Sequence, residues 1–372
     1  MRLTIERAAL LKALTHVQSV VERRNTIPIL SNVLLSAQDS ALRLTATDLD
    51  IEISEDAFAE VERAGSTSAP AQFLYDFVRK LPEGASIKLE LGGDDARLSV
   101  WAGKARLNLP VLPAQDFPVM PVDALATRFE IHPGELKRLI DKTRFAISTE
   151  ETRYYLNGIY LHTAVADGEP KLRGVATDGH RLALADTHAP DGAQGMPGVI
   201  VPRKTIGELR RLLDDASDSV KIAASDQKIR FEIGDAVLTS KLIDGSFPEY
   251  ARVIPKGNTR ILRVENRVFA EAVDRVATVS AERSRSVKMA LDGDRLTLTV
   301  NNPDAGLATE DLPAEYESEP MEIGFNARYL LDVAGQIEGD SVQFEFADSG
   351  SPTLVRDESD PHAIYVLMPL RV

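Results

Sequence analysis

The sequence predicts an α+β fold made of three repeated domains, each built from two helix-plus-sheet halves. Three observations support this prediction. Three segments begin with the same strand-then-helix pattern, polar corners recur at a fixed offset, and a second helix follows in each segment. Divided equally, the chain has domains of about 124 residues, which is an ordinary domain size.

Each repeat is expected to open with a short strand that runs into an amphipathic helix. The openings read RLTIERAALLKAL from Arg2, RFEIHPGELKRLI from Arg128 and ILRVENRVFAEAV from Ile261. In each, apolar and polar residues first alternate, and apolar residues then recur at helical spacing. Pro133 suits the first turn of a helix. The first helices are therefore predicted over residues 6–20, 133–146 and 265–279.

A polar corner follows a strand-rich stretch in each repeat. The corners read LTATDLD from Leu44, GVATDGH from Gly174 and LTVNNPD from Leu298. The Thr-Asp pairs of the first two corners lie 130 residues apart, as do the Phe-Pro pairs that begin at Phe117 and Phe247. A shared offset between separate landmarks indicates that these segments are copies of one unit.

Second helices are predicted over residues 71–81, 203–213 and 326–337. Alternating strands follow them, such as SIKLELGGDDARLSVWAG from Ser86. The Pro-containing stretches Pro118–Thr127 and Val253–Arg260 are predicted linkers. The domains are therefore expected at residues 1–122, 123–256 and 257–372.

Composition excludes several classes of protein. A hydrophobic fraction of 44% and a charged fraction of 27% are typical of a globular chain, and no apolar run approaches 18 residues, so we expect no membrane association. The absence of cysteine excludes disulfides and fits a cytoplasmic location. The six histidines form no HExxH or HxH cluster, so neither a metal nor another cofactor is expected.

The distribution of charge is more informative than its total of −14. The six expected helices contain fifteen basic and nine acidic residues, a net charge of +6, which leaves −20 for the rest of the chain. If the helices share one surface, that surface attracts phosphate without reading sequence. An ordinary solvated helix face explains the same numbers equally well.

The corner TDGHR, which begins at Thr177, has the look of a catalytic loop. However, an aspartic protease has Asp-Thr-Gly in the other order, and no Gly-x-Ser-x-Gly supplies a nucleophile. We expect Thr177 and Asp178 to form a turn by bonding local backbone amides, as at Thr47 and Asp48. The residues from Gly179 onward are particular to the second repeat, which hints at a separate task there.

The whole chain resembles the bacterial sliding clamps, the beta subunits of DNA polymerase III. The stretches that carry the resemblance are RYYLNGIYL from Arg153, VATDGHRLAL from Val175, VIVPRKTIGEL from Val199, TSKLIDGSFPEYARVIP from Thr239 and YVLMPLRV from Tyr365. The resemblance implies three DNA-clamp domains per chain and a ring of two chains joined head to tail, with helices lining the hole. Packed side by side, six helices would leave a hole of only about 9 Å, whereas twelve leave about 28 Å. Two chains are therefore needed to encircle a duplex.

The resemblance also implies a non-catalytic processivity factor that encircles double-stranded DNA and tethers the replicative polymerase. The implied partners are the polymerase III alpha subunit, a clamp-loader ATPase, and other polymerases, ligase and mismatch-repair proteins that carry short linear motifs. The chain has no GxxxxGK[ST] motif of its own, so the loader must supply the energy for opening.

In this family partner peptides dock in a hydrophobic cleft. Carried onto this chain, the cleft consists of Leu156, Thr177, Gly179, His180, Arg181, Leu182, Pro248, Arg252, Val253, Val366, Met368, Pro369, Leu370 and Arg371. The apolar members would form an adaptable floor, and Arg181 and Arg371 would pair with acidic or carbonyl groups of the peptide.

DNA contacts are expected from family-matched loops and from basic residues on the helices. The loop positions are Arg24, Tyr154 and Tyr155, and the helix positions are Lys12, Arg79, Lys80, Lys137, Arg138, Lys142, Arg203, Lys204, Arg210 and Arg211. Glu150 stands where the family has a neutral amide, which puts a strand contact by the loop Ser148–Glu151 in doubt. The dimer interface is expected to join Leu107 and Leu109 of one chain to Thr278 and Val279 of the other.

Two other classes of function are left open by the residues themselves. One is a hydrolase with an acidic site around Asp48, Asp178 and His180. The other is a repeat scaffold that binds only proteins.

Overall fold

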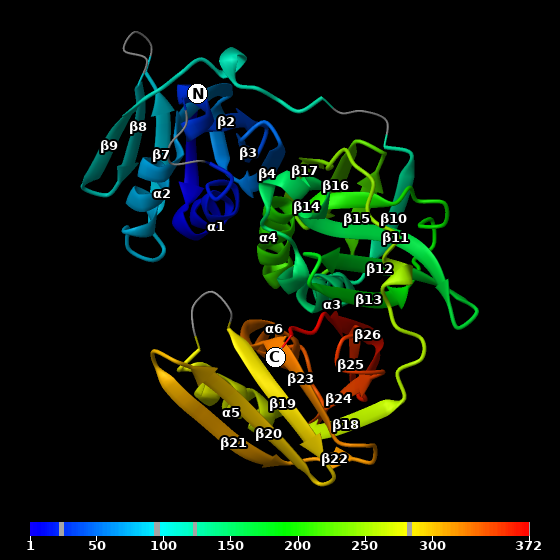
Figure 1. The fold of residues 1–372 in the computed structure, drawn as a ribbon. Helices are drawn as coiled ribbons and strands as arrows, with labels where there is room; N and C mark the ends of the chain where they lie inside the picture. Colours follow the sequence, from blue (N-terminus) through cyan, green and yellow to red (C-terminus); the bar gives the residue numbers. More distant parts are fainter. Residues whose placement is uncertain (22–25, 93–96, 122–124, 281–284, 372) are drawn as a thin grey trace. The chain divides into compact units, whose positions relative to one another are not determined.

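A computed structural model describes residues 1–21, 26–92, 97–121, 125–280 and 285–371. The chain forms two compact units (Figure 1). The first consists of Met1–Leu136, Pro190–Pro197 and Lys204–Leu242, and the second of Lys137–Ala189, Gly198–Arg203 and Ile243–Val372.

The first unit contains two antiparallel sheets. The larger has eight strands in the order β10 (Thr127–Ile131), β15 (Val220–Ala224), β16 (Lys228–Ile233), β17 (Ala236–Lys241), β4 (Ile51–Phe58), β3 (Ala41–Thr47), β2 (Asn32–Gln38) and β6 (Gly65–Pro70). The smaller has five, in the order β5 (Glu60–Arg63), β1 (Arg2–Glu6), β7 (Ser86–Leu91), β8 (Arg97–Ala102) and β9 (Ala105–Pro110).

The second unit repeats this plan. Its larger sheet has nine strands in the order β14 (Val199–Pro202), β11 (Gly158–Ala166), β12 (Glu169–Thr177), β13 (Arg181–His188), β26 (Asp360–Leu367), β25 (Thr353–Asp357), β24 (Ser341–Phe346), β18 (Arg260–Glu265) and β22 (Glu315–Tyr316). Its smaller sheet has four, in the order β21 (Gly306–Pro313), β20 (Arg295–Asn302), β19 (Ser286–Asp292) and β23 (Met321–Asn326).

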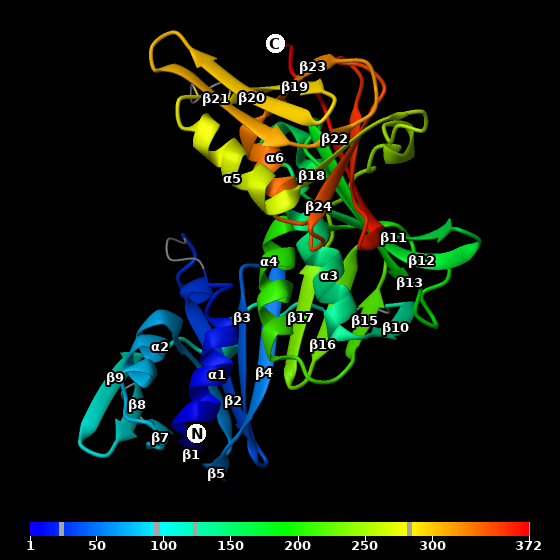
Figure 2. The ribbon, with the colours of Figure 1, turned by 90° about the horizontal axis from the view of Figure 1, so that it is seen from below.

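Each larger sheet crosses a boundary between sequence repeats. In the first unit β17 pairs with β4, with Leu238 opposite Ile53 and both side chains fully buried. Figure 2 shows β15–β17 running on into β4, β3 and β2. In the second unit β13 pairs with β26, with Leu184 opposite Ile364. The second repeat is thus divided, and each half extends the sheet of a neighbouring repeat.

All six predicted α-helices are present in the described ranges, with ends a few residues inside the predicted ones. They are α1 (Arg7–Val17), α2 (Ala71–Arg79), α3 (Pro133–Thr143), α4 (Arg203–Leu212), α5 (Asn266–Ala277) and α6 (Ala327–Ala334). The missing ends are short 3₁₀ turns or irregular turns, for example η3 (Arg144–Ala146) and η5 (Leu213–Asp215).

Apolar faces hold the helices on the sheets, as their sequence spacing requires. Helix α1 packs against α2 and against β4, and α5 packs against α6 and against the strands β19–β21 (Figure 1). Leu10, Leu14 and Val17 of α1 are fully buried, as are Phe269 and Val273 of α5. Burial of such side chains contributes about 1.5–3 kcal/mol each to folding.

Candidate functional site

An apolar hollow of about 210 Å³ opens on the surface of the second unit. Its floor is rigid, because Leu182 and Val366 belong to a buried cluster that also includes Val175, Leu184 and Leu354. Aromatic side chains pack beside the hollow, where Phe247 stacks on Tyr160 and packs edge-on against Tyr250. Eleven residues line it: Leu156, Thr177, Gly179, Arg181, Leu182, Pro248, Glu249, Tyr250, Val253, Val366 and Met368.

A second hollow, of about 380 Å³, shares Met368 with the first. It is lined by His180, Ser286, Asn326, Tyr329, Met368, Pro369, Leu370 and Arg371. Two backbone hydrogen bonds fix the C-terminal segment between the two hollows. Met368 N donates to His180 O at 2.9 Å, and Leu370 N donates to Gly324 O at 2.8 Å. The side chains of Met368 and Leu370 stay partly exposed, so apolar surface is presented on an anchored segment.

The structure therefore brings together most of the predicted cleft residues. Nine line the first hollow, and five, with Met368 in common, line the second. Arg252 lines neither hollow; its side chain is 82% exposed and pairs with Glu249. The two linings also contain five residues outside the predicted set, namely Glu249, Tyr250, Ser286, Asn326 and Tyr329.

The guanidinium of Arg181 has other partners than the ones predicted for it. Its side chain is only 7% exposed. The guanidinium donates to Phe145 O at 2.7 Å and to the carboxylates of Asp178 and Asp332. The prediction that Arg181 pairs with a bound peptide is wrong for this arrangement, because its N–H groups are already directed at these internal acceptors. Arg181 instead holds the wall between the two hollows.

The Thr-Asp corners are turns, as predicted. Thr177 Oγ1 donates to Arg181 O at 2.7 Å, and Asp178 Oδ1 accepts from the amides of His180 and Arg181 at 2.9 and 3.0 Å. The first repeat has the same bonds, from Thr47 to Ile51 O and from the amides of Asp50 and Ile51 to Asp48. The carboxylates of these two corners thus serve the backbone, which speaks against the hydrolase alternative.

Some of the cations that were predicted to contact DNA pair instead with groups of the same chain. Lys142 is 5% exposed; its Nζ donates to Gln336 O at 2.6 Å and pairs with Glu338 at 2.7 Å. This burial removes Lys142 from the DNA-facing set. Arg138 pairs with Asp360, with 2.6 Å between Nη2 and Oδ2. Both predictions assumed that a basic residue on a helix points to solvent, whereas these two point to acids of the third repeat.

In the first unit, three more predicted cations are bound within the chain. Arg211 donates to Thr15 O and His16 O, each at 2.8 Å, and so satisfies carbonyls at the C-terminal end of α1. Lys204 pairs with Asp48 and Arg210 with Asp214, although Lys204 remains partly exposed. These contacts lower the number of cations that are fully available to phosphate.

The other predicted cations on or next to the helices reach solvent to differing degrees. Lys12, Arg79, Lys80 and Arg203 are exposed, and Lys137 is half-buried. Tyr154 is exposed and meets Tyr155 edge-on, with ring centroids 5.8 Å apart. Glu150 pairs with Arg153 at 3.2 Å. Arg24 lies outside the described residues.

The predicted dimer residues lie at or near open sheet edges. Leu107 and Leu109 are on β9, an edge strand, but Leu109 is buried in its own unit, so only its backbone is available. Thr278 caps the C-terminal end of α5 and Val279 follows it, while Arg275 of α5 pairs with Glu310 on the edge strand β21.

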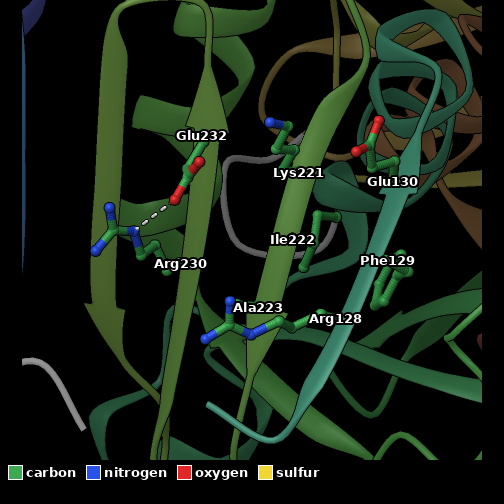
Figure 3. A pocket seen from close by; sticks show the side chains of 8 residues that line it. All are labelled: Arg128, Phe129, Glu130, Lys221, Ile222, Ala223, Arg230 and Glu232. Carbon is green, nitrogen blue, oxygen red and sulfur yellow. Dashed lines mark ion pairs between the residues drawn. The ribbon is translucent and has the colours of Figure 1, made fainter. Parts of the chain in front are cut away.

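The first unit has a hollow of about 280 Å³ on its larger sheet (Figure 3). Glu130, Lys221 and Glu232 stand opposite one another on β10, β15 and β16, and Arg230 pairs with Glu232 at 3.1 Å. Opposite charges in register are typical of an exposed sheet face. Five charged residues thus line this hollow beside Phe129, Ile222 and Ala223.

In the part of the chain that the structure describes, His, Asp and Glu form no group of three that could hold a metal ion. None of the described helices is long and apolar enough to cross a membrane.

Family comparisons agree with this geometry over the whole chain. Models of the DNA polymerase III beta subunit match residues 1–121 with the N-terminal domain, 130–249 with the central domain and 251–371 with the C-terminal domain. The beta sliding clamp of Caulobacter vibrioides is 64% identical over 372 residues, which is 100% of both chains.

Solved structures of clamps have the same fold. A crystal structure of the Caulobacter crescentus beta sliding clamp superposes with a TM-score of 0.98 at 64% identity, covering 100% of this chain and 99% of that one. A Bartonella birtlesii sliding clamp bound to griselimycin superposes with a TM-score of 0.97 at 51% identity, covering 100% of both. The predicted α+β class, the clamp domains and the non-catalytic function as a DNA sliding clamp are confirmed. The chain belongs to the family of bacterial beta sliding clamps, the beta subunits of DNA polymerase III.

Proposed function

We propose that the two adjoining hollows of the second unit form one cleft that captures a short apolar segment of partner proteins. The observation that carries this proposal is the anchored C-terminal segment. Met368 and Leu370, both partly exposed, stand at hollows of about 210 and 380 Å³. Methionine is flexible and polarisable, which suits a surface that must accept several sequences. The griselimycin-bound clamp of Bartonella birtlesii supports a ligand cleft in this family.

The partners of this cleft are, by family membership, the polymerase III alpha subunit and the clamp loader, together with other polymerases, ligase and mismatch-repair proteins. All would compete for one site. The cleft is small, so each partner would occupy it with a few side chains and detach readily. We also propose that the protein is located in the cytoplasm, together with the DNA that it encircles.

The chain acts on duplex DNA as a head-to-tail homodimer in this proposal. The open edges β9 and β21 are complementary in charge, since β9 carries the exposed Arg106 while β21 carries the exposed Asp311. Their pairing would remove two open edges from each chain. Lys12 and Lys80, which are exposed on or beside the helices, would face the phosphates. Sedimentation tests this interface: a monomer at micromolar concentration would contradict it.

The cleft is tested by the binding of a labelled peptide of apolar and aromatic residues, followed by fluorescence anisotropy. Met368→Ala is expected to weaken binding at least tenfold, and deletion of residues 368–372 to abolish it, without a change of dimer mass. Val165→Ala is the matched control, because Val165 is an equally apolar residue that is 77% exposed on β11 and lines neither hollow. Unchanged affinity in both cleft variants would overturn the assignment.

A further inference from the structure

A third hollow, of about 330 Å³, adjoins the proposed cleft in the second unit. Unlike its neighbours it is strongly basic. Four arginines line it, Arg144 from η3, Arg181 from β13, Arg203 from α4 and Arg328 from α6, against the two carboxylates of Glu150 and Asp178. The chain as a whole carries −14, so an arginine cluster of this kind stands out from its surroundings.

The two carboxylates of the lining already have partners. Asp178 is paired with Arg181 at 3.1 Å, and Glu150 is paired with Arg153 at 3.2 Å. The other three arginines are more available. Arg203 is exposed, Arg144 is 50% exposed and lies 3.3 Å from Asp141, and Arg328 is 67% exposed and lies 3.8 Å from Asp332. Asp332 also accepts from Arg181, so it neutralises Arg328 only in part.

The basic hollow adjoins both parts of the cleft. It shares His180 and Tyr329 with the hollow at the C-terminal segment, and Arg181 with the apolar hollow. A chain bound in the cleft that continues past the ring of Tyr329 therefore arrives among Arg144, Arg203 and Arg328.

We propose that this hollow receives an aspartate or glutamate side chain that flanks the apolar segment of a partner. The inference rests on the proposed peptide cleft and adds an electrostatic determinant to it. Arginine pairs with carboxylate through parallel N–H···O bonds. Three exposed and only partly neutralised arginines around one small hollow therefore favour the binding of a single anionic group.

A phosphate of a DNA strand is the competing anion, and the structure favours the carboxylate. Glu150 and Glu151 stand side by side in one loop, and Glu151 is exposed. A nucleic-acid strand brings a charge with every nucleotide and would meet these two acids in succession. One carboxylate on a peptide side chain avoids them, and a volume of about 330 Å³ suits one or two side chains.

The test uses the full-length dimer and two labelled peptides that share one apolar segment. One peptide has two aspartates on each side of the segment, and the other has two asparagines in the same places. At low salt the acidic peptide is expected to bind about fivefold more tightly, and this preference should shrink at high salt. In the double variant Arg144→Ala, Arg328→Ala the preference should vanish while the affinity for the asparagine peptide stays unchanged.

Arg263→Ala is the matched control, since Arg263 is a partly exposed, ion-paired arginine on β18 outside all three hollows. Equal binding of the two peptides to the unaltered protein overturns this proposal alone. A double variant that loses affinity for DNA but keeps its preference for the acidic peptide assigns the hollow to phosphate and also overturns it. Failure of both peptides to bind overturns the cleft itself.

Discussion

The guanidinium carbon of Arg181 lies 4.4 Å from the centre of the Tyr329 ring. The two residues are 148 positions apart in sequence, on β13 and α6, and their contact forms the wall shared by the hollows of the second unit. A cation over an aromatic face, together with the bonds to Asp332 and Phe145, fixes both side chains. The cleft is therefore built on a rigid partition.

Loss of the Arg181 guanidinium, which forms this partition with Tyr329, should destabilise the second unit. Arg181→Met is expected to lower the free energy of unfolding of the second unit by about 2–4 kcal/mol, because it leaves buried acceptors without a donor. Thermal and denaturant unfolding followed by near-UV circular dichroism measure this. Arg252→Ala, which removes an arginine that is 82% exposed, should change the stability by less than about 0.5 kcal/mol. A similar small effect for Arg181→Met would contradict the account.

Substitutions at the third residue of the two Thr-Asp turns, Gly179 and Leu49, should have opposite effects on the stability of the protein. Gly179 has φ +88°, and Leu49 holds φ +80° in the same turn of the first repeat. Gly179→Ala should cost about 1–2 kcal/mol and weaken peptide binding, since an added Cβ would also lie 2.7 Å from Arg153 Nη1. Leu49→Gly should be neutral or stabilising by up to about 1 kcal/mol. The comparison is made by denaturant unfolding, and destabilisation by Leu49→Gly would refute the argument.

His16 makes the stability of the first unit dependent on pH. It is buried between Glu55 on β4 and Asp215 in η5, with 2.9 Å between Nε2 and Asp215 Oδ2. Burial lowers the pKa of His16, but the hydrogen bonds and charges of Glu55 and Asp215 outweigh it and raise the pKa above 6.5. Because the folded pKa is raised, the stabilisation is complete below pH 6.5 and is lost as the pH rises through the folded value.

The measurement of this effect can use the single tryptophan, Trp101, which lies on β8 of the first unit. Unfolding followed by Trp101 fluorescence should show a free-energy difference between the unaltered protein and His16→Gln that shrinks from pH 6 to pH 9. A difference that is constant with pH would show that folding does not shift the pKa of His16, and a difference that grows with pH would show that folding lowers it.

The helix cations should separate into two classes in DNA binding. Lys12→Ala and Lys80→Ala, at exposed positions, should each reduce the slope of log affinity against log salt on duplex DNA by about 0.9 per lysine removed, or about 1.8 per dimer. Lys142→Met should leave the slope unchanged and lower stability instead, because Lys142 is buried against Glu338. Filter binding over a salt series gives the slopes. An equal change for Lys142→Met would restore it to the DNA-facing set.

Much of the architecture could be predicted because it is local and repeated. The corners at Thr47 and Thr177 use bonds that span at most four residues, so a short sequence specifies them. The helices follow from apolar spacing alone. The helices end one to three residues earlier than predicted, since in α3 and α4 the last turn relaxes into 3₁₀ geometry that the spacing does not reveal.

The partners of the charged residues could not be predicted, because they come from distant repeats. Lys142 looks solvent-facing in its helix, yet its acceptor Glu338 is 196 residues away. Tyr329 reads as an ordinary residue of an amphipathic helix until β13 brings Arg181 over its ring. The pairing of β13 with β26 forms the proposed cleft, and the local sequence of neither strand indicates that the two strands pair.

The central claim is that this chain stays on DNA by topology. The direct measurement places the labelled protein on a nicked circular duplex with a clamp loader and follows its retention by gel filtration at high salt. The protein is expected to stay on the circle and to leave within minutes once a restriction enzyme linearises it. Equal retention on the circle and on the linear product, or equal loss from both, would contradict a closed ring around DNA.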